Sequence, residues 1–319
     1  MPRPSPHQLL AGLGAALLLA RSAPARACSV CGCGDPLLLS SDPAAIAGPL
    51  RLQLDAEYLR VDAGTDGAPG STDELVQWST RLNLAWRPLE ALSLTATLPW
   101  VHKTIRTVGG GAAVTSSELA GPGDVEVAAR WSAWRAVEVG ARRVQEVAFS
   151  AGSALPTGRK DARDGGALID PHGQLGTGGW GPFAGVHYRL EQGDFTAFAS
   201  LSYRVRTEAR YFDGTRYRFG DAALWSLHGQ WQASRRWVLD LGLDGRRAAA
   251  DRATDEAGLV DPRVASTGGT VLAAAPAVYL GVGGELWLFA RGQLPVLQAL
   301  RGQQRVWPSA SLGLQLTVR

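Results

Sequence analysis

Apolar and polar residues alternate in runs of about ten to twelve residues, from residue 50 to the end of the chain. A two-residue period places successive side chains on opposite faces of a β-strand, so each run predicts a strand with one apolar and one polar face. The connectors between the runs are alternately short and long. A barrel of antiparallel strands that crosses a membrane has this pattern, because its turns are short at one rim and its loops are long at the other.

We therefore predict an all-β chain that forms a transmembrane, antiparallel, up-and-down β-barrel of about twelve strands. One of the clearest runs is 236–247, where Trp237 and Leu241 oppose Asp240 and Asp244. A soluble β-sandwich does not require connectors that alternate so strictly in length, and we favour the barrel for that reason. The expected strands cover residues 50–60, 75–87, 91–102, 123–134, 145–155, 179–190, 194–206, 217–233, 236–247, 269–281, 285–295 and 306–318.

The connectors fall into two classes by length and composition. Gly, Pro and polar residues predict tight turns at 88–90, 191–193, 234–235 and 283–284. Longer loops, all at the opposite rim, are expected at 61–74, 103–122, 156–178, 207–216, 248–268 and 296–305. The connector 134–144 fits neither class, because it is too long for a tight turn. The 11 tryptophans lie mostly towards the ends of the runs, where aromatic girdles meet lipid headgroups.

The first 27 residues have the composition of a secretory signal peptide, with Arg3, an apolar run at 9–20 and an A-x-A site that ends at Ala27. The run is shorter than the ~20 residues with which a helix spans a bilayer. We favour cleavage after Ala27. Acylation of Cys28 is the alternative, although Arg26 is an unusual residue before a lipidated cysteine. The predicted parts are a signal peptide (1–27), a cysteine-containing periplasmic segment (28–48) and a barrel in the outer membrane of a Gram-negative bacterium (49–319).

The charge balance argues against a nucleic-acid partner. The chain has 32 Lys+Arg and 29 Asp+Glu, but residues 1–27 hold three of the cations and none of the acids, which leaves 29 of each. A neutral exported chain has no basic surface in excess. Outer-membrane lipid is the expected partner of the apolar strand faces.

The polar strand faces are expected to line the lumen. A salt-bridged interior that only props the barrel open is one interpretation, because buried charges are normally paired. The other is a narrow channel for small solutes, in which Arg rows handle anionic or polar molecules without a cofactor. The same face also holds Asp55, Glu57 and Asp244. The candidate lumen residues are Arg81, Glu126, Arg130, His187, Arg189, Arg204, His228, Asp240, Arg246 and Arg291.

All three cysteines lie within six residues, as Cys28, Cys31 and Cys33. Thiolates at this spacing could hold Cu(I) or Zn(II), and an envelope protein whose barrel anchors such a periplasmic metal site is an alternative function. In an oxidising compartment, a disulfide with one cysteine left over is equally natural, and lipidation would consume Cys28. Redox catalysis is a further, weaker interpretation. No His follows the cysteines as haem attachment would require.

An enzyme is not expected. His102, His172, His187 and His228 could serve a serine hydrolase, but no G-x-S-x-G elbow marks a nucleophile. The glycine-rich stretches lie in expected loops and not between a strand and a helix, so they are not phosphate cradles.

Three glycine-containing stretches resemble the family of outer-membrane, transporter-like barrels named for the MetA pathway of phenol degradation. They are Gly121-Pro122-Gly123-Asp124-Val125-Glu126-Val127, Leu155-Pro156-Thr157-Gly158 and Leu175-Gly176-Thr177-Gly178-Gly179-Trp180-Gly181-Pro182, with a weaker echo in Phe219-Gly220-Asp221-Ala222. The resemblance implies a barrel that passes small, aromatic compounds. The cysteine-rich segment is not part of that pattern, and Arg319 stands where barrels that the assembly machinery inserts often end in an aromatic residue.

The shared stretches have a local structural explanation. Gly-x-Gly-Asp allows the backbone to turn from a loop into a strand, with Asp124 accepting hydrogen bonds from nearby amides. Pro156 ends the preceding strand because proline has no N–H to donate to the ladder. We therefore assign folding roles to these residues, not binding roles.

Overall fold

The computed structural model describes residues 49–64, 72–108, 115–164, 167–211, 214–254, 263–264, 266–302 and 304–318. The predicted signal peptide and the periplasmic segment with Cys28, Cys31 and Cys33 lie outside the described residues. None of the helical segments in the described ranges has the length and hydropathy needed to cross a membrane.

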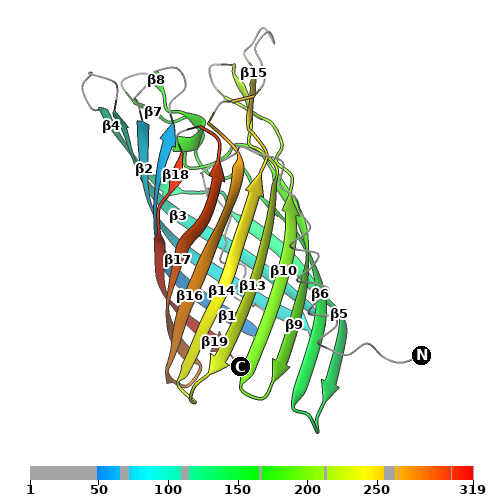
Figure 1. Ribbon diagram of the computed structural model, residues 1–319. Helices are drawn as coiled ribbons and strands as arrows, with labels where there is room; N and C mark the ends of the chain where they lie inside the picture. Colours follow the sequence, from blue (N-terminus) through cyan, green and yellow to red (C-terminus); the bar gives the residue numbers. More distant parts are fainter. Residues whose placement is uncertain are drawn as a thin grey trace.

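Twelve antiparallel strands form a closed barrel (Figure 1), which confirms the predicted fold class. Each strand pairs with its neighbours in sequence, and β1 closes the ring because Leu50 pairs with both Trp86 and Val318. The wall strands are β1 (Leu50–Gly64), β2 (Thr72–Leu89), β3 (Leu92–Val108), β5 (Glu126–Glu138), β6 (Arg143–Ala154), β9 (Gly181–Gln192), β10 (Phe195–Arg204), β13 (Ala222–Gln232), β14 (Trp237–Ala248), β16 (Gly269–Gly283), β17 (Leu286–Leu300) and β19 (Ser309–Val318).

The short turns gather at one rim and the long loops at the other, as the connector lengths predicted (Figure 1). The start of β1 and the end of β19 lie at the short-turn rim. The long loops carry structure of their own, because strand pairing continues above the barrel wall. Their elements are β4 (Thr115–Pro122), β7 (Arg163–Asp164), β8 (Ala167–Leu168), the 3-10 helix η3 (Pro171–Gly173), β11 (Ala209–Arg210), β12 (Arg216–Arg218), β15 (Arg252–Thr254) and β18 (Arg305–Val306).

The prediction of a long connector at 134–144 is wrong, because only four residues separate β5 from β6. β5 continues to Glu138, and a β-bulge between Ser132 and Trp134 shifts its register against β6. The extra residue places Trp131 and Trp134 on the same outer face, although they are three positions apart. The two-residue period is therefore interrupted at the bulge, which is why the strand looked shorter in the sequence.

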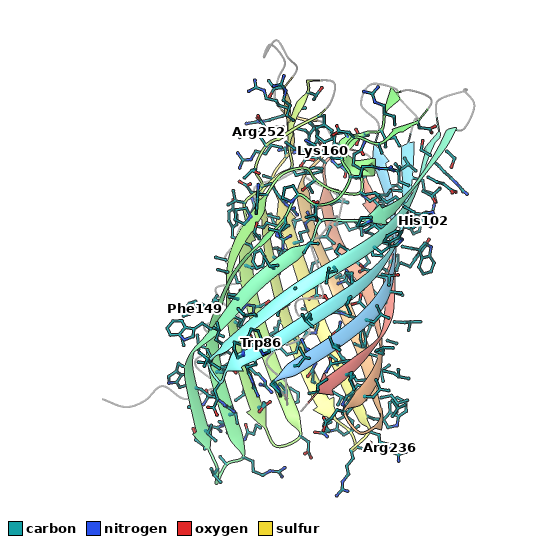
Figure 2. The ribbon with its side chains drawn as sticks, turned by 180° about the vertical axis from the view of Figure 1, so that it is seen from behind. Trp86, His102, Phe149, Lys160, Arg236 and Arg252 are labelled. Carbon is teal, nitrogen blue, oxygen red and sulfur yellow. The ribbon has the colours of Figure 1, made fainter. Side chains whose placement is uncertain are left out.

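The two faces of the wall differ as the alternation predicted. The outward residues Trp237, Leu239, Leu241 and Leu243 are exposed, whereas Asp240 and Asp244 between them are buried. Figure 2 shows Phe149 and His102 projecting away from the wall. Outward aromatic residues such as Trp86, Trp231 and Trp237 lie close to the short-turn rim. An apolar belt with aromatic residues near its edge is the surface that a barrel presents to lipid.

Candidate functional site: the lumen and its mouth

The lumen wall contains every residue predicted to line it. All ten lie on inward positions of wall strands and are buried or half-buried. The structure brings Arg204 together with Glu126 and His228 together with Asp240. Arg246 lies half-buried at an inward position of β14, and the other candidates contact residues outside this set of ten. These contacts are Arg81 with Asp55 and Glu57, Arg130 with Glu146, His187 with Ser150, Arg189 with Glu191, and Arg291 with Asp244.

The first cluster joins neighbouring strands β1, β2 and β3. Arg81 Nη2 lies 2.7 Å from Asp55 Oδ2, and Arg81 Nη1 lies 2.9 Å from Glu57 Oε2. Asn83 donates to Asp55 Oδ1 at 2.8 Å and accepts from Thr97 Oγ1 at 2.8 Å. One guanidinium therefore binds two carboxylates at adjacent inward positions, so each buried carboxylate has a cationic partner beside it.

The second cluster connects strands that are not neighbours. Arg204 on β10 donates to Glu126 on β5 at 2.6 Å, although β6 and β9 lie between them. The inward residues at the register of Glu126 on those two strands are Ala154 and Gly181, and Arg204 itself pairs with Phe183 of β9. A Cβ on Gly181 would lie 3.7 Å from Arg204 Cδ, so the arginine side chain runs against the wall at that point. The small residues therefore leave room for the ion pair.

The third cluster surrounds His228 on β13. Its two ring nitrogens lie 2.8 Å from Asp240 Oδ1 and 3.0 Å from Asp244 Oδ1. Both carboxylates accept, so this arrangement suits an imidazolium that donates from each nitrogen. Asp244 also accepts from Arg291 at 2.8 Å, and the His228 ring stacks on Phe198 with centroids 4.8 Å apart.

Inward rings in this wall lie against glycines. A Cβ on Gly242 would come within 2.2 Å of His228, and one on Gly152 within 2.6 Å of Phe183. A Cβ on Gly313 would likewise lie 2.4 Å from Cζ of Phe289. Large inward groups therefore press against the backbone of the neighbouring strand. Glycine and alanine beneath the charged and aromatic groups keep those groups close to the wall.

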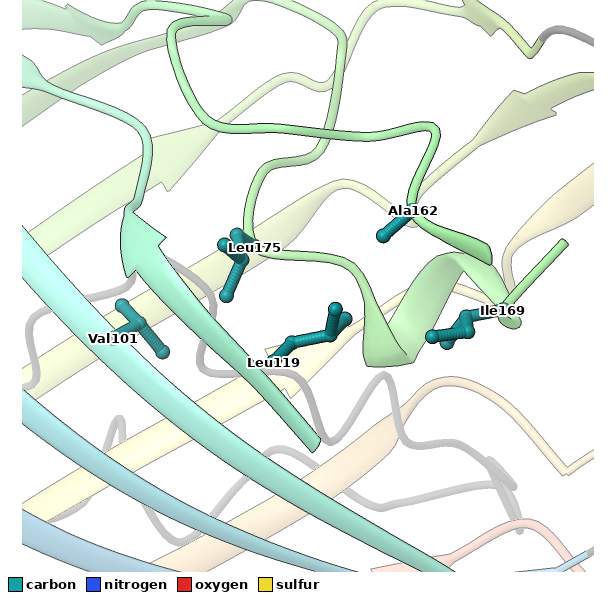
Figure 3. Close-up of a cluster of buried hydrophobic side chains, with 5 residues drawn as sticks. All are labelled: Val101, Leu119, Ala162, Ile169 and Leu175. Carbon is teal, nitrogen blue, oxygen red and sulfur yellow. The ribbon is translucent and has the colours of Figure 1, made fainter. Parts of the chain in front are cut away.

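The mouth at the long-loop rim is different, because apolar side chains and loops cover it. The segment between β6 and β9 folds inward and buries Ala162, Ile169 and Leu175 against Val101 and Leu119 of β3 and β4 (Figure 3). A second cluster joins Val61 and Leu75 with Ile105, and Ile105 also packs against the first. We call this covering, made by residues 155–180, the mouth segment.

Lys103 of β3 attaches the mouth segment to one wall. Its side chain is fully buried, and Nζ donates to the carbonyl oxygens of His172 at 3.1 Å and Gln174 at 2.5 Å. Gln174 is itself buried and exchanges hydrogen bonds with Ala162 and Ile169. The lysine thus satisfies carbonyl groups at the end of η3, and the glutamine side chain satisfies backbone groups of Ala162 and Ile169.

His172 attaches η3 to the opposite side of the mouth. Its Nε2 lies 2.8 Å from Asp251 Oδ2, and its Nδ1 lies 2.8 Å from Asp170 Oδ1. Asp251 also accepts from Tyr217 at 2.8 Å and from the Gly220 amide at 2.7 Å. Burial alone would lower the pKa of His172, but the two carboxylates outweigh it and raise that pKa from 6.5 to about 10. Although desolvation acts to raise it, the pKa of Asp170 is held below its usual value by the His172 imidazolium.

The three stretches that carry the family resemblance meet at the root of the mouth segment. Asp124 Oδ1 accepts from the Gly158 amide at 2.9 Å, and Asp124 Oδ2 accepts from the amide and the hydroxyl of Thr177, each at 2.7 Å. Thr157 Oγ1 accepts from the Val125 amide at 2.8 Å. The predicted folding role of Asp124 is therefore confirmed, and its amide partners come from the two other stretches.

Sequence reasoning did not select Lys103, Gln174 or Asp251, and it considered His172 only as a catalytic candidate. Lys103 continues the inward alternation of β3, which runs to Val108. A predicted strand that extended beyond residue 102 would have placed Lys103 on the lumen face. Gln174 and Asp251 lie in irregular segments without a period, and no pattern identifies their partners. Among the described residues, no group of three His, Cys, Asp or Glu side chains is arranged to hold a metal ion.

No protein-family model and no curated protein matches this chain. Solved structures share its fold. The COG4313 outer membrane channel from Pseudomonas putida F1 superposes with a TM-score of 0.63 at 13% identity, over 86% of this chain and 98% of that one. The transport unit of the autotransporter AIDA-I from Escherichia coli superposes with a TM-score of 0.55 at 11% identity, over 89% and 94%. At such identities the likeness establishes the barrel fold and nothing finer.

Proposed function

We propose that this protein is an outer-membrane channel for the passive passage of small solutes. The apolar outer belt suits lipid, and the closed wall encloses a face of charged and polar groups. The COG4313 outer membrane channel, which has the same fold, supports the same assignment. Barrel assembly machinery would insert the chain after export by its predicted signal peptide.

The observation that carries the proposal is that the large inward side chains lie against the barrel wall. A barrel stabilised only by an interior plug would direct its ion pairs across the lumen. Here the Arg204–Glu126 pair runs over Ala154 and Gly181, and the rings of His228 and Phe289 lie against glycines. Large groups that lie against the wall fill less of the centre than ion pairs directed across it would, and a barrel of about this size can hold a small molecule.

We propose small anionic or aromatic solutes. Arginines whose carboxylate partners lie beside them can exchange a partner for a passing carboxylate or phosphate, because a guanidinium binds each in the same bidentate geometry. The aromatic part of the proposal rests on the resemblance to the MetA-pathway family and on inward rings such as Phe183 and Phe198.

The alternative of a plugged structural barrel is favoured by one observation, the apolar packing at the mouth. Planar-bilayer recordings of the refolded protein would separate the two functions. A second protein, with residues 161–173 replaced by a short Gly-Ser linker, would have the mouth uncovered. We expect this uncovered protein to show stepwise increases in conductance. When Glu126→Gln is added to it, the reversal potential in a salt gradient should shift in the direction of greater anion selectivity. Absence of conductance from this folded, uncovered barrel would leave the plugged structure as the better explanation.

A metal site at Cys28, Cys31 and Cys33 stays a separate proposal, because these residues lie outside the described ranges. It would give the envelope protein a copper- or zinc-binding segment beside the barrel.

A further inference from the structure

The short helix η3 lies in the mouth and is held from two opposite sides by side-chain contacts. Lys103, which holds its carbonyl groups, is on β3, and Asp251, which holds the His172 ring, follows the end of β14 by three residues. Five wall strands separate β3 from β14 in each direction around the closed ring. The two attachments of η3 therefore lie across the opening from each other, and η3 with the side chains of Lys103 and His172 bridges it.

The two ends of this bridge are held by different chemistry. On the β3 side, Lys103 is reinforced by the apolar cluster of Val101, Leu119, Ala162, Ile169 and Leu175, and Asp124 fixes the root of the mouth segment nearby. On the β14 side, η3 reaches the wall through the side chain of His172, which binds Asp251 and lies edge-on to Tyr217 and Phe219. One end is thus held by an apolar core, and the other by a single side chain of η3, the His172 imidazolium, which contacts Asp251, the Tyr217 hydroxyl 3.2 Å away and the edges of two aromatic rings.

These chemistries respond differently to opening. Separating the apolar cluster would expose carbon surface to water, which is unfavourable in proportion to its area. Separating His172 from Asp251 exposes two ions, and their hydration offsets much of the lost attraction. The contact with Asp251 is therefore the end of the bridge that opens more readily.

We propose that η3 is the gate of this channel, that the His172–Asp251 contact is its latch, and that the Asp124 root and the β3 side act as the hinge. This inference rests on the proposed channel function and names its regulation. Release of the latch swings η3 towards β3 and opens the half of the mouth that adjoins β13, β14 and β16.

The test is single-channel recording of the refolded full-length protein and two latch variants, Asp251→Asn and His172→Gln. Asp251→Asn keeps Oδ1 as the acceptor for the Gly220 amide, but it replaces Oδ2, which faces His172 and Tyr217, with an uncharged amide nitrogen. We expect about a tenfold rise in the ratio of open to closed time, which corresponds to the loss of one hydrogen bond between charged groups. Glu208→Gln is the matched control, because Glu208 is an exposed loop carboxylate 3.9 Å from Arg216. It should leave the ratio unchanged.

The protein with residues 161–173 replaced by a linker separates the two possible failures. If it conducts while Asp251→Asn and His172→Gln gate like the unaltered protein, the latch is refuted and the channel stands. If it does not conduct, the channel itself is refuted. Heat-dependent migration in detergent gels verifies that each barrel is folded, and His172→Gln decides the matter if Asp251→Asn does not fold.

Discussion

Replacing Gly242 with alanine tests whether the lumen groups really lie against the wall. Gly242 has no backbone conformation that excludes alanine, so the added methyl group is the whole perturbation. The added Cβ would lie 2.2 Å from Nδ1 and 2.3 Å from Cε1 of His228, which is far shorter than any van der Waals contact. The imidazole must therefore leave its place between Asp240 and Asp244.

The magnitude follows from what the ring loses. Displacement breaks at least one of its two hydrogen bonds to a carboxylate, worth about 1.5–3 kcal/mol. It also disturbs the stack on Phe198, which contributes about 0.5–1.5 kcal/mol beyond its buried area. We expect Gly242→Ala to lower the free energy of unfolding by about 2–4 kcal/mol. Urea unfolding of the barrel in lipid vesicles, followed by tryptophan fluorescence, would measure it.

Two controls make the result specific to the ring. At Gly140, in the turn after β5, an added methyl group meets nothing within 4 Å, so Gly140→Ala should change stability by under about 0.5 kcal/mol. In a His228→Ala background the clash is absent, and Gly242→Ala should again cost little. Equal stabilities of Gly242→Ala and Gly140→Ala, or a cost that persists without the ring, would show that the His228 ring does not lie against the wall at Gly242.

Three further predictions concern the mouth and the N-terminal segment. First, the raised pKa of His172 means that its ion pairs hold η3 fully below about pH 6.5 and weaken as the pH rises towards 10; open time in bilayers should therefore increase between pH 7 and 10, and His172→Gln should abolish that increase. Second, Asp124→Asn removes the charge that accepts three hydrogen bonds at the loop root and should destabilise the mouth segment by about 1–3 kcal/mol, seen as faster proteolysis within 155–180 while the wall stays protected. Third, the reduced mature protein should bind about one Cu(I) or Zn(II), and a triple Cys→Ser variant none; equal binding by both proteins would remove the metal site.

The barrel wall could be predicted because its constraint is local. Each wall strand has lipid on one face and the lumen on the other, so the two-residue period of a stretch such as Trp237–Leu243 already specifies which side chains point inward. All ten lumen candidates follow from this period. It fails at the bulge near Ser132, where one extra residue reverses the alternation.

The partners of those inward residues could not be predicted. Arg204 meets Glu126, which is 78 positions away in sequence, because β5 and β10 are close in the closed ring and Ala154 and Gly181 leave a path between them. Side-chain contacts between strands that are not neighbours depend on the curvature of the barrel wall and on the volumes of the side chains between them. The alternation within one strand gives no information about either.

The sequence by itself determined the class of fold, the two faces of its wall and the rim at which the long loops lie, because strand period and turn chemistry act over a few residues. The closure of the mouth was decided by the tertiary structure. Lys103, His172 and Asp251 come from three separate segments, two of them without any period, and they acquire a common role only when η3 is placed across the barrel. Burial then forces the lysine, the imidazolium and the carboxylate to find partners, since charges removed from water without them are strongly unfavourable.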